Sequence, residues 1–167
     1  MQTKVKYEQA INTKYPEQVV IAIARDANGK ANPVTLGWTM IASGEPPMMA
    51  IAVASAHYSV RCIRHSECFT LVFPSSDMAD AAVFFGSNSG RDIDKLASFE
   101  CKTQQAEKID SVLLADAVAN FECTLESETQ AGDHLIFVGK VVASHVNTKP
   151  QTRLYTTAPG LKLGAVC

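Results

Sequence analysis

The feature that most constrains the fold is a set of short apolar segments, each followed by turn residues. The two longest, residues 19–24 and 48–54, are far shorter than the ~20 residues that a membrane-spanning helix requires. Residues 19–24 are partly β-branched and precede the Asn28-Gly29 dipeptide, which favours positive φ, so we expect a strand and then a hairpin turn. Residues 48–54 are apolar at every position, which predicts a strand buried on both faces and central in a sheet or barrel.

Further strands and helices follow without the regular strand–helix–strand order of a parallel sheet. We expect strands over residues 33–43, 68–73, 117–125 and 135–146, and an irregular tail over residues 150–167. We expect short helices over residues 59–66, 77–85 and 89–99, the first and last capped by Ser59 and Ser89. Gly37 indicates a bulge or a close backbone approach by another group. About six strands with helices between them predict a mainly β fold with short helices, an antiparallel sheet closing into a barrel.

Length, charge and cysteine content exclude several classes of protein. A typical domain has ~150 residues, so 167 residues predict a single domain over residues 1–167. A net charge of −2, from 15 basic and 17 acidic residues, is too balanced for binding a nucleic-acid backbone. A hydrophobic content of 47% excludes a disordered chain. The first ten residues lack a secretory h-region and the five scattered cysteines indicate free thiols, so we expect a cytoplasmic protein without nucleic-acid or membrane partners.

The first polar cluster, residues 55–61, lies where a central strand is expected to lead into a helix. Such a junction directs unpaired backbone N–H groups and the positive end of the helix dipole at one point, where an anion can bind. The side chains that would reinforce this site are Ser55, His57, Ser59 and Arg61. The alternative is that Ser59 only caps the helix and the arginines are solvated.

A second polar cluster, residues 87–95, contains Ser89, Arg91 and Lys95, which can all contact a phosphate or a ring carbonyl. Arg91 and Lys95 are spaced one helical turn apart, which places them on one helix face. The alternative is an ordinary helix start with these cations paired to neighbouring aspartates. A third cluster, Gly132-Asp133-His134, opens the last strand, where a single histidine is most often an edge residue.

Trp38 is the single tryptophan, and it follows Gly37 in an expected strand. A planar conjugated ligand could lie against its indole, with backbone groups reading the edge of that ligand. Packing in the core is the alternative interpretation, because large aromatic side chains are usually buried.

Two other kinds of chemistry have weaker support. A zinc site is the alternative indicated by four potential ligands within twelve residues, His57, Cys62, His65 and Cys68, although their spacing matches no CxxC pair. Neither a P-loop nor a GxGxxG motif is present, so a Rossmann-type cofactor site is not supported. No cysteine or other nucleophile has an evident base beside it. We therefore predict no catalytic side chain and no bound metal.

Five segments, in this order, resemble the flavin reductase family of FMN-binding split barrels, and its flavoredoxin-like branch in particular. They are a strand with Trp38, the Pro46-Pro47 turn, the Ser-rich loop and Arg-containing helix from residue 55, the S-x-R-x-x-D-K pattern of residues 89–95 and the Gly-Asp-His strand start. The resemblance extends over about residues 19–142. It implies a six-stranded split β-barrel of the FMN-binding type, and a homodimer with two FMN sites at or near the subunit interface.

The resemblance also implies which residues hold FMN. The isoalloxazine ring would contact Asn32, Thr35, Leu36, Gly37 and Trp38. The ribityl chain and phosphate would contact Ser55, Ala56, His57, Ser59, Ser89, Arg91 and Lys95. His134 would lie in the flavin region.

The activity implied is that of an FMN-dependent oxidoreductase, passing electrons from NAD(P)H or a redox protein through FMN to an acceptor. The flavin itself carries the hydride or single-electron step, which agrees with a sequence that offers no evident catalytic acid, base or nucleophile. The alternative is a non-catalytic flavin-binding module for storage or sensing on the same barrel.

Overall fold

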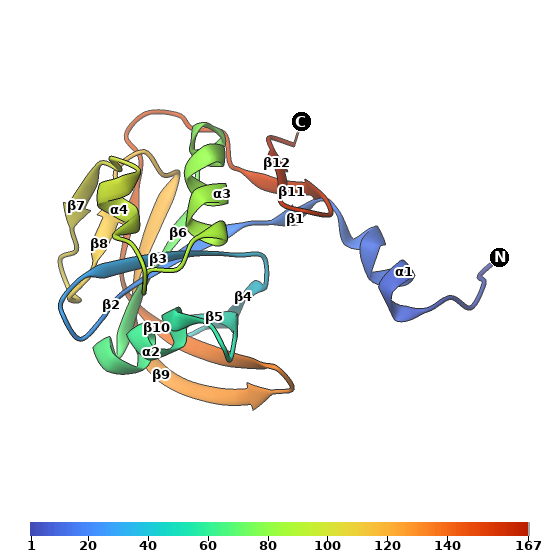
Figure 1. The fold of residues 1–167 in the computed structure, drawn as a ribbon, viewed down its shortest axis with the longest axis horizontal. Helices are drawn as coiled ribbons and strands as arrows, with labels where there is room; N and C mark the ends of the chain where they lie inside the picture. Colours follow the sequence, from blue (N-terminus) through green and yellow to red (C-terminus); the bar gives the residue numbers. More distant parts are fainter. Residues whose placement is uncertain (167) are drawn as a thin grey trace.

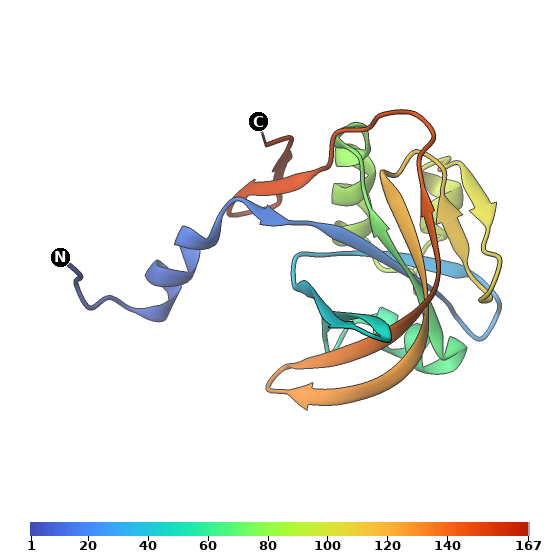
Figure 2. The ribbon, with the colours of Figure 1, turned by 180° about the vertical axis from the view of Figure 1, so that it is seen from behind.

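The computed structural model describes residues 1–166, and its largest element is an antiparallel sheet of seven strands (Figure 1). Its strands are β2 (Val20–Arg25), β3 (Ala31–Leu36), β4 (Thr39–Gly44), β5 (Pro47–Ala54), β6 (Cys68–Phe73), β9 (Ala119–Ala131) and β10 (His134–Val146). They are hydrogen-bonded in the order β3-β2-β6-β9-β10-β5-β4. Figure 2 shows how strongly the long strands β9 and β10 curve, and β3 also approaches β5. The prediction of a mainly β, antiparallel fold with short helices is confirmed.

Smaller elements surround this sheet. A three-stranded sheet, in the order β1-β11-β12, contains β1 (Glu17–Gln18), β11 (Tyr155–Ala158) and β12 (Lys162–Gly164). A two-stranded sheet contains β7 (Thr103–Gln105) and β8 (Val112–Leu114). The helices are α1 (Tyr7–Ile11), η1 (Asn12–Lys14), α2 (Tyr58–Ser66), η2 (Ser76–Met78), α3 (Ala79–Ser87) and α4 (Lys95–Ser98). Within residues 1–166, no helix is both long and apolar enough to cross a membrane.

Strand β2 is buried on both faces because its alternate side chains enter two different cores. Val20, Ala22 and Ala24 belong to a core that the sheet shares with α2, whose larger members include Ile51, Ile63, Phe69, Leu71 and Phe137. Ile21 and Ile23 belong to a second core, which the sheet shares with α3 and β8 and whose larger members include Val72, Phe85, Leu114 and Leu154. A strand buried on both faces needs a continuous apolar run, which explains residues 19–24.

Gly139 of β10 allows the Phe69 ring to lie across the strand. A Cβ at residue 139 would come within 2.6 Å of Phe69 Cζ and 2.7 Å of Cys123 Cβ, and both of those side chains are fully buried. The register between β9 and β10 shifts at this point. The close packing of the first core therefore depends on the absence of a side chain at Gly139.

The single strand expected over residues 33–43 is interrupted at Gly37 and Trp38. Its first half, β3, pairs with β2, and its second half, β4, pairs with β5 on the opposite edge of the sheet. The main sheet therefore has seven strands rather than the predicted six. The prediction of an irregular tail was also wrong, because β11 pairs with β1 and β12.

Both predicted serine caps were wrong. Helix α2 begins one residue after His57, so Ser59 is its second residue, and its side chain is buried instead of capping the helix. Ser89 lies in a turn, where its Oγ accepts a hydrogen bond from the Arg91 backbone N–H. The following helix, α4, is capped by Asp94, whose Oδ1 accepts from the Ala97 N–H at 3.1 Å.

Apolar and polar residues alternate over residues 117–125, which predicts a half-exposed strand with Glu122 on its exposed face, yet Glu122 of β9 is fully buried. Its carboxylate accepts hydrogen bonds from three consecutive backbone N–H groups, those of Glu107, Lys108 and Ile109, and lies 2.7 Å from His145 Nε2. Burial by itself would raise the pKa of Glu122, but the amides and the imidazole outweigh it and hold the pKa below its ordinary value. Glu122 thereby anchors the segment between β7 and β8 to the main sheet.

We expect Glu122→Gln to lower the free energy of unfolding at pH 7 by about 2 to 3 kcal/mol, because several bonds to a charged acceptor are weakened together. A carboxylate whose folded pKa is depressed stabilises the fold above its unfolded pKa and loses that effect as the pH falls through the folded pKa. The difference between wild type and variant should therefore be full at pH 7 and shrink below about pH 4.5. Urea unfolding across this range measures it. The exposed Glu126→Gln is the control, expected within about 0.5 kcal/mol of wild type; an equal loss in both variants would contradict the role of Glu122.

Candidate functional site

Two adjoining pockets lie at the β3 side of the sheet, and His57 lines both of them. The first, which we call the polar pocket, has a volume of about 300 Å³ and lies among β3, the start of α2, the end of α3 and the loop of residues 88–91. The second, which we call the tryptophan pocket, has a volume of about 230 Å³ and lies among β1, Trp38, the end of β5 and the start of β10. The two volumes together fall in the range of a small-molecule site.

Lys95 is the most unusual residue of the polar pocket, because its side chain is only 3% exposed. Its Nζ donates to the backbone oxygens of Pro33 at 2.7 Å and Phe85 at 2.8 Å. Among the described residues no carboxylate forms an ion pair with it. Burial lowers the pKa of Lys95 to about 8. A buried cation with no anion beside it is costly, and an anionic ligand in the pocket would compensate it.

Asn32 provides a second incomplete group in the polar pocket. Its Nδ2 donates to Ser59 Oγ at 3.0 Å, whereas its Oδ1 is buried with no hydrogen-bond partner. A Cβ at Gly90 would overlap this Oδ1, so glycine is required where the loop crosses Asn32. In the first turn of α2 the Val60 N–H donates to the His57 backbone oxygen at 3.2 Å, and the N–H groups of Tyr58 and Ser59 can add to the donors available to an anion.

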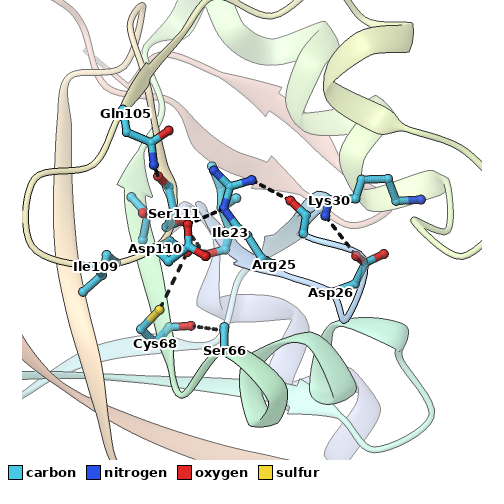
Figure 3. A network of polar contacts seen from close by, with 12 residues as sticks. Ile23, Arg25, Asp26, Lys30, Ser66, Cys68, Gln105, Ile109, Asp110 and Ser111 are labelled. Carbon is cyan, nitrogen blue, oxygen red and sulfur yellow. Dashed lines mark hydrogen bonds and ion pairs between the residues drawn. The ribbon is translucent and has the colours of Figure 1, made fainter.

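Polar contacts of the β2–β3 turn hold the loop of this pocket in place, and Figure 3 shows one of them, the bond from the Lys30 backbone N–H to Asp26. Asp26 is buried, and its Oδ1 accepts from the backbone N–H groups of Asn28 and Lys30. Its Oδ2 accepts from the hydroxyl of Tyr58, which lines the pocket. Figure 3 shows the Lys30 side chain extending away from Asp26, and its Nζ donates to the backbone oxygen of Gly90 at 2.6 Å. The turn therefore positions two walls of the pocket.

Trp38 is half-exposed at 50%, so the alternative interpretation of core packing is wrong. The centroid of its ring lies 4.5 Å from that of His134. The Nδ1 atom of His134 lies 2.7 Å from Asp133 Oδ1, and this hydrogen bond lowers the pKa of Asp133. At Gly37, where the strand is interrupted, the Glu17 side chain lies close to the backbone, with its Oε1 3.2 Å from where a Cβ would stand. The rim of the tryptophan pocket therefore presents an accessible indole beside an oriented imidazole.

The structure brings most of the predicted site residues to the two pockets. Those that line the polar pocket are Asn32, Ala56, His57, Ser59, Ser89, Arg91 and Lys95. Those that line the tryptophan pocket are Thr35, Leu36, Gly37, Trp38, His57 and His134. Asn32 was expected beside the ring, but it lies in the polar pocket. Ser55 lines neither pocket; it is exposed, and its Oγ accepts from Gln130 Nε2.

Arg91 and Lys95 do not share a helix face, contrary to the prediction. Arg91 lies in the turn before α4, is exposed, and has its guanidinium 5.6 Å from the centroid of the Tyr58 ring. Lys95 begins α4 and points into the protein. The pairing of these cations with Asp92 or Asp94, which the alternative interpretation predicted, is absent among the described residues.

Several lining residues were missed by sequence reasoning. The tryptophan pocket is lined by residues from both ends of the chain. They are Tyr15 and Glu17 near the N-terminus, and Thr156 and Leu161 near the C-terminus. No local motif marks them, because they reach the pocket only through the pairing of β1 with β11. Gly86 and Gly90 also line the polar pocket. The only sequence signal for them is that they are glycines next to the polar cluster of residues 87–95.

The four residues of the zinc alternative do not form a site. Cys62 is a residue of α2 that is buried in the first core, and Cys68 is buried on β6. Throughout residues 1–166, no three His, Cys, Asp or Glu side chains are grouped closely enough to hold a metal ion. Burial raises the pKa of the Cys62 thiol to about 11, which is the environment of a packing residue rather than a ligand or nucleophile.

Comparison with known proteins identifies the family. The chain matches the family described as flavin reductase like domain over residues 12–159, and it belongs to that family. The structure of flavoredoxin from Methanosarcina acetivorans superposes with a TM-score of 0.86 at 25% identity, over 100% of this chain and 92% of that one. The resemblance drawn from the sequence is confirmed.

Two curated relatives are similar in sequence. A protein of Aeropyrum pernix is 28% identical over 126 residues, which is 75% of this chain and 48% of that protein. A protein of Streptomyces nodosus subsp. asukaensis, named an NADH-dependent FMN reductase, is 27% identical over 115 residues, which is 67% of this chain and 60% of that protein. The chain therefore spans about half to three-fifths of the length of these relatives.

We expect Gly90→Ala to destabilise the protein by about 1 to 3 kcal/mol, because the new methyl group overlaps Asn32 Oδ1. Thermal or urea unfolding measures the loss. In an Asn32→Ala background the same change should cost clearly less, since the clashing atom is gone. Gly44→Ala is the control, because nothing lies within 4 Å of a Cβ at that position. Equal costs for Gly90→Ala in both backgrounds would show that this contact is not the cause.

Proposed function

We propose that this protein is an FMN-dependent oxidoreductase that passes electrons from NAD(P)H or a redox protein, through FMN, to an acceptor. The observation that carries the proposal is the buried, uncompensated Lys95 ammonium in a pocket that adjoins a half-exposed tryptophan. FMN has a dianionic phosphate at one end and a flat amphipathic ring at the other. The two pockets offer a complement to each end, in adjoining positions.

The polar pocket fits the phosphate and ribityl chain. Lys95 supplies positive charge, and the first turn of α2 supplies N–H donors. The free Oδ1 of Asn32 can accept from a ribityl hydroxyl, which would satisfy the atom that lacks a partner. Ser89 and Arg91 lie on the loop that closes the pocket.

The tryptophan pocket fits the isoalloxazine ring. Its lining is largely apolar around Leu36 and Trp38, which suits a flat conjugated ring. When bound, the flavin supplies the hydride and electron chemistry. The residues of the chain hold and orient it: the Trp38 indole covers part of the pocket, and Asp133 fixes the orientation of the His134 imidazole at the rim.

The electron donor and acceptor are proposals supported by relatives. The Streptomyces nodosus relative is named for NADH and FMN, and the structural neighbour is a flavoredoxin. We further propose a single domain that works as a homodimer in the cytoplasm. Cys62, Cys68, Cys101 and Cys123 are free, which agrees with a reducing compartment.

We expect the purified protein to bind FMN and to lose its visible flavin absorbance on anaerobic titration with NADH or NADPH. The flavin spectrum, followed against the amount of donor added, reports occupancy and donor preference together. Reduced ferredoxin tests a protein donor in the same cell. Bound flavin that none of these donors bleaches would favour the alternative of a flavin-binding module for storage or sensing, and failure to bind FMN would overturn both.

We expect Lys95→Met to weaken FMN binding by about 10- to 100-fold while changing riboflavin binding much less, because only FMN has the phosphate. In wild type, FMN affinity should fall as the pH rises through about 8, where the free protein's buried ammonium loses its proton. The variant should lack this pH dependence. Flavin fluorescence titration measures both. Lys102→Met, an exposed lysine outside both pockets, is the control; equal weakening of riboflavin and FMN in Lys95→Met would place the phosphate elsewhere.

A further inference from the structure

The first fourteen residues form an arm that projects away from the rest of the chain (Figures 1 and 2). Helix α1 within it has five residues, none of them buried, and its N-cap makes no side-chain hydrogen bond. Val5 is 50% exposed and Tyr7 is 70% exposed. The arm therefore carries exposed apolar side chains and a helix in which no residue is buried.

A helix this short is not stable by itself in water. Fixing the first turn costs more conformational entropy than one or two hydrogen bonds return, so isolated helices of fewer than about 12 residues are marginal. Helices of this length in proteins are stabilised by packing on another surface. The arm accordingly requires a surface that its own body does not provide.

The same chain has an apolar surface without a cover. On the outer side of β4, β5 and β10, the paired residues Met40, Ala50 and Val138 form one row, and Ala52 and Ile136 form the next. We call these residues, together with Trp38, the outer face. Met40 is 61% exposed and Trp38 is 50% exposed, whereas Ala50 at the bottom of the face is only 3% exposed, and the face is hollowed by a groove of about 540 Å³. Strand β5 was predicted to be buried on both faces, yet only its inner face, with Ile51 and Val53, lies in a core of the described chain.

The arm leaves the body beside this face. Lys14, its last residue, has its Nζ 5.9 Å from the centroid of the Trp38 ring. Glu17 and Gln18 of β1, the next strand along the chain, line the groove of the outer face. The arm is basic, because it contains Lys4, Lys6 and Lys14 and one acidic residue, Glu8.

The exposed acidic residues around the outer face complement this charge. Glu45 is exposed at the β4–β5 turn, and Glu126 and Asp133 are exposed on the β9–β10 hairpin, against one exposed lysine, Lys140. Opposite charge around an apolar centre is the usual arrangement of a protein interface, in which the rim is polar and the core is not.

We propose that the arm of each protomer packs on a second copy of this chain, at or beside that copy's outer face. The inference rests on the proposed homodimer and names the segments that form it. In a two-fold symmetric pair each chain contributes both an arm and a face, so one interface covers all four surfaces at once. Trp38 belongs both to the outer face and to the tryptophan pocket, so the partner's arm would form part of the surroundings of that pocket.

A photo-crosslinking experiment tests the position of the arm. Tyr7 is replaced by benzoylphenylalanine in the full-length chain without added flavin, and dimers are formed from a mixture of ordinary and ¹⁵N-labelled chains. We expect crosslinks between light and heavy chains, with peptides from residues 38–54 or 134–142. Phe99, exposed and distant in sequence, takes the same probe as the control and should give no such product. Crosslinks only within one chain, or to other regions of the partner, would overturn the proposal.

Variants of the arm and of the outer face test how much each contributes to the stability of the dimer. Tyr7→Asp and Met40→Asp should each raise the dimer dissociation constant at least about tenfold, because each introduces a charge where an apolar side chain is covered. Gln2→Asp, which changes the charge of the arm without removing an apolar group, should have a much smaller effect. Circular dichroism confirms that the variants fold, and light scattering on flavin-free protein measures the mass.

The outcomes separate this inference from the proposed function. Wild-type protein that is monomeric at all concentrations, or variants that leave the dimer unchanged, would overturn the arm proposal even if FMN binds. Failure to bind FMN, with the arm crosslinked to the partner as expected, would overturn the proposed function and leave the interface established.

Discussion

The structure depends on the burial of β2 between two apolar cores. Because alternate side chains of this strand enter the two cores, the sheet must curve around one core while α3 and β8 pack against its other side. The two cores are therefore coupled, since each uses half of the same strand. The polar pocket lies where these layers meet: between β3, which pairs with β2, and the helices α2 and α3 of the two cores. The position of the candidate site thus follows from the same packing that stabilises the fold.

The polar side chains of the site are held by the backbone of this frame. Lys95 is fixed by carbonyl groups from β3 and from the end of α3, so its charge is presented at the junction of two layers. Asp26 and Lys30 use the turn that leads into β3 to hold Tyr58 and the loop at Gly90. A flavin phosphate would therefore meet donors that are already in place, which reduces the entropy lost on binding. The tryptophan pocket, in contrast, borders an uncovered apolar face, and we expect its surroundings to be completed by a second chain.

Much of the fold and of the site could be predicted from the sequence. The apolar runs, the Asn28-Gly29 turn and the short helices gave the antiparallel β class, and all the proposed flavin residues except Ser55 line one of the two pockets. The errors have physical causes. Ser59 has the chemistry of a helix cap, but the helix starts one residue earlier, at Tyr58. The Ser59 hydroxyl instead accepts a hydrogen bond from Asn32 Nδ2. Glu122 occupies a polar position in the alternation, but three backbone N–H groups distant in sequence make its burial favourable.

The amino-acid sequence by itself determined the class of fold, the strand at residues 19–24 with its following turn, and the family resemblance, because these depend on local periodicity and on motifs a few residues long. The tertiary structure alone decided three things: the division of residues 33–43 between opposite edges of the sheet, the contribution of both chain ends to the tryptophan pocket and the burial of Lys95 without a carboxylate. Each of these depends on which distant segments meet. Local sequence does not encode that information, because the free energy of each contact depends on the partner that the rest of the chain supplies.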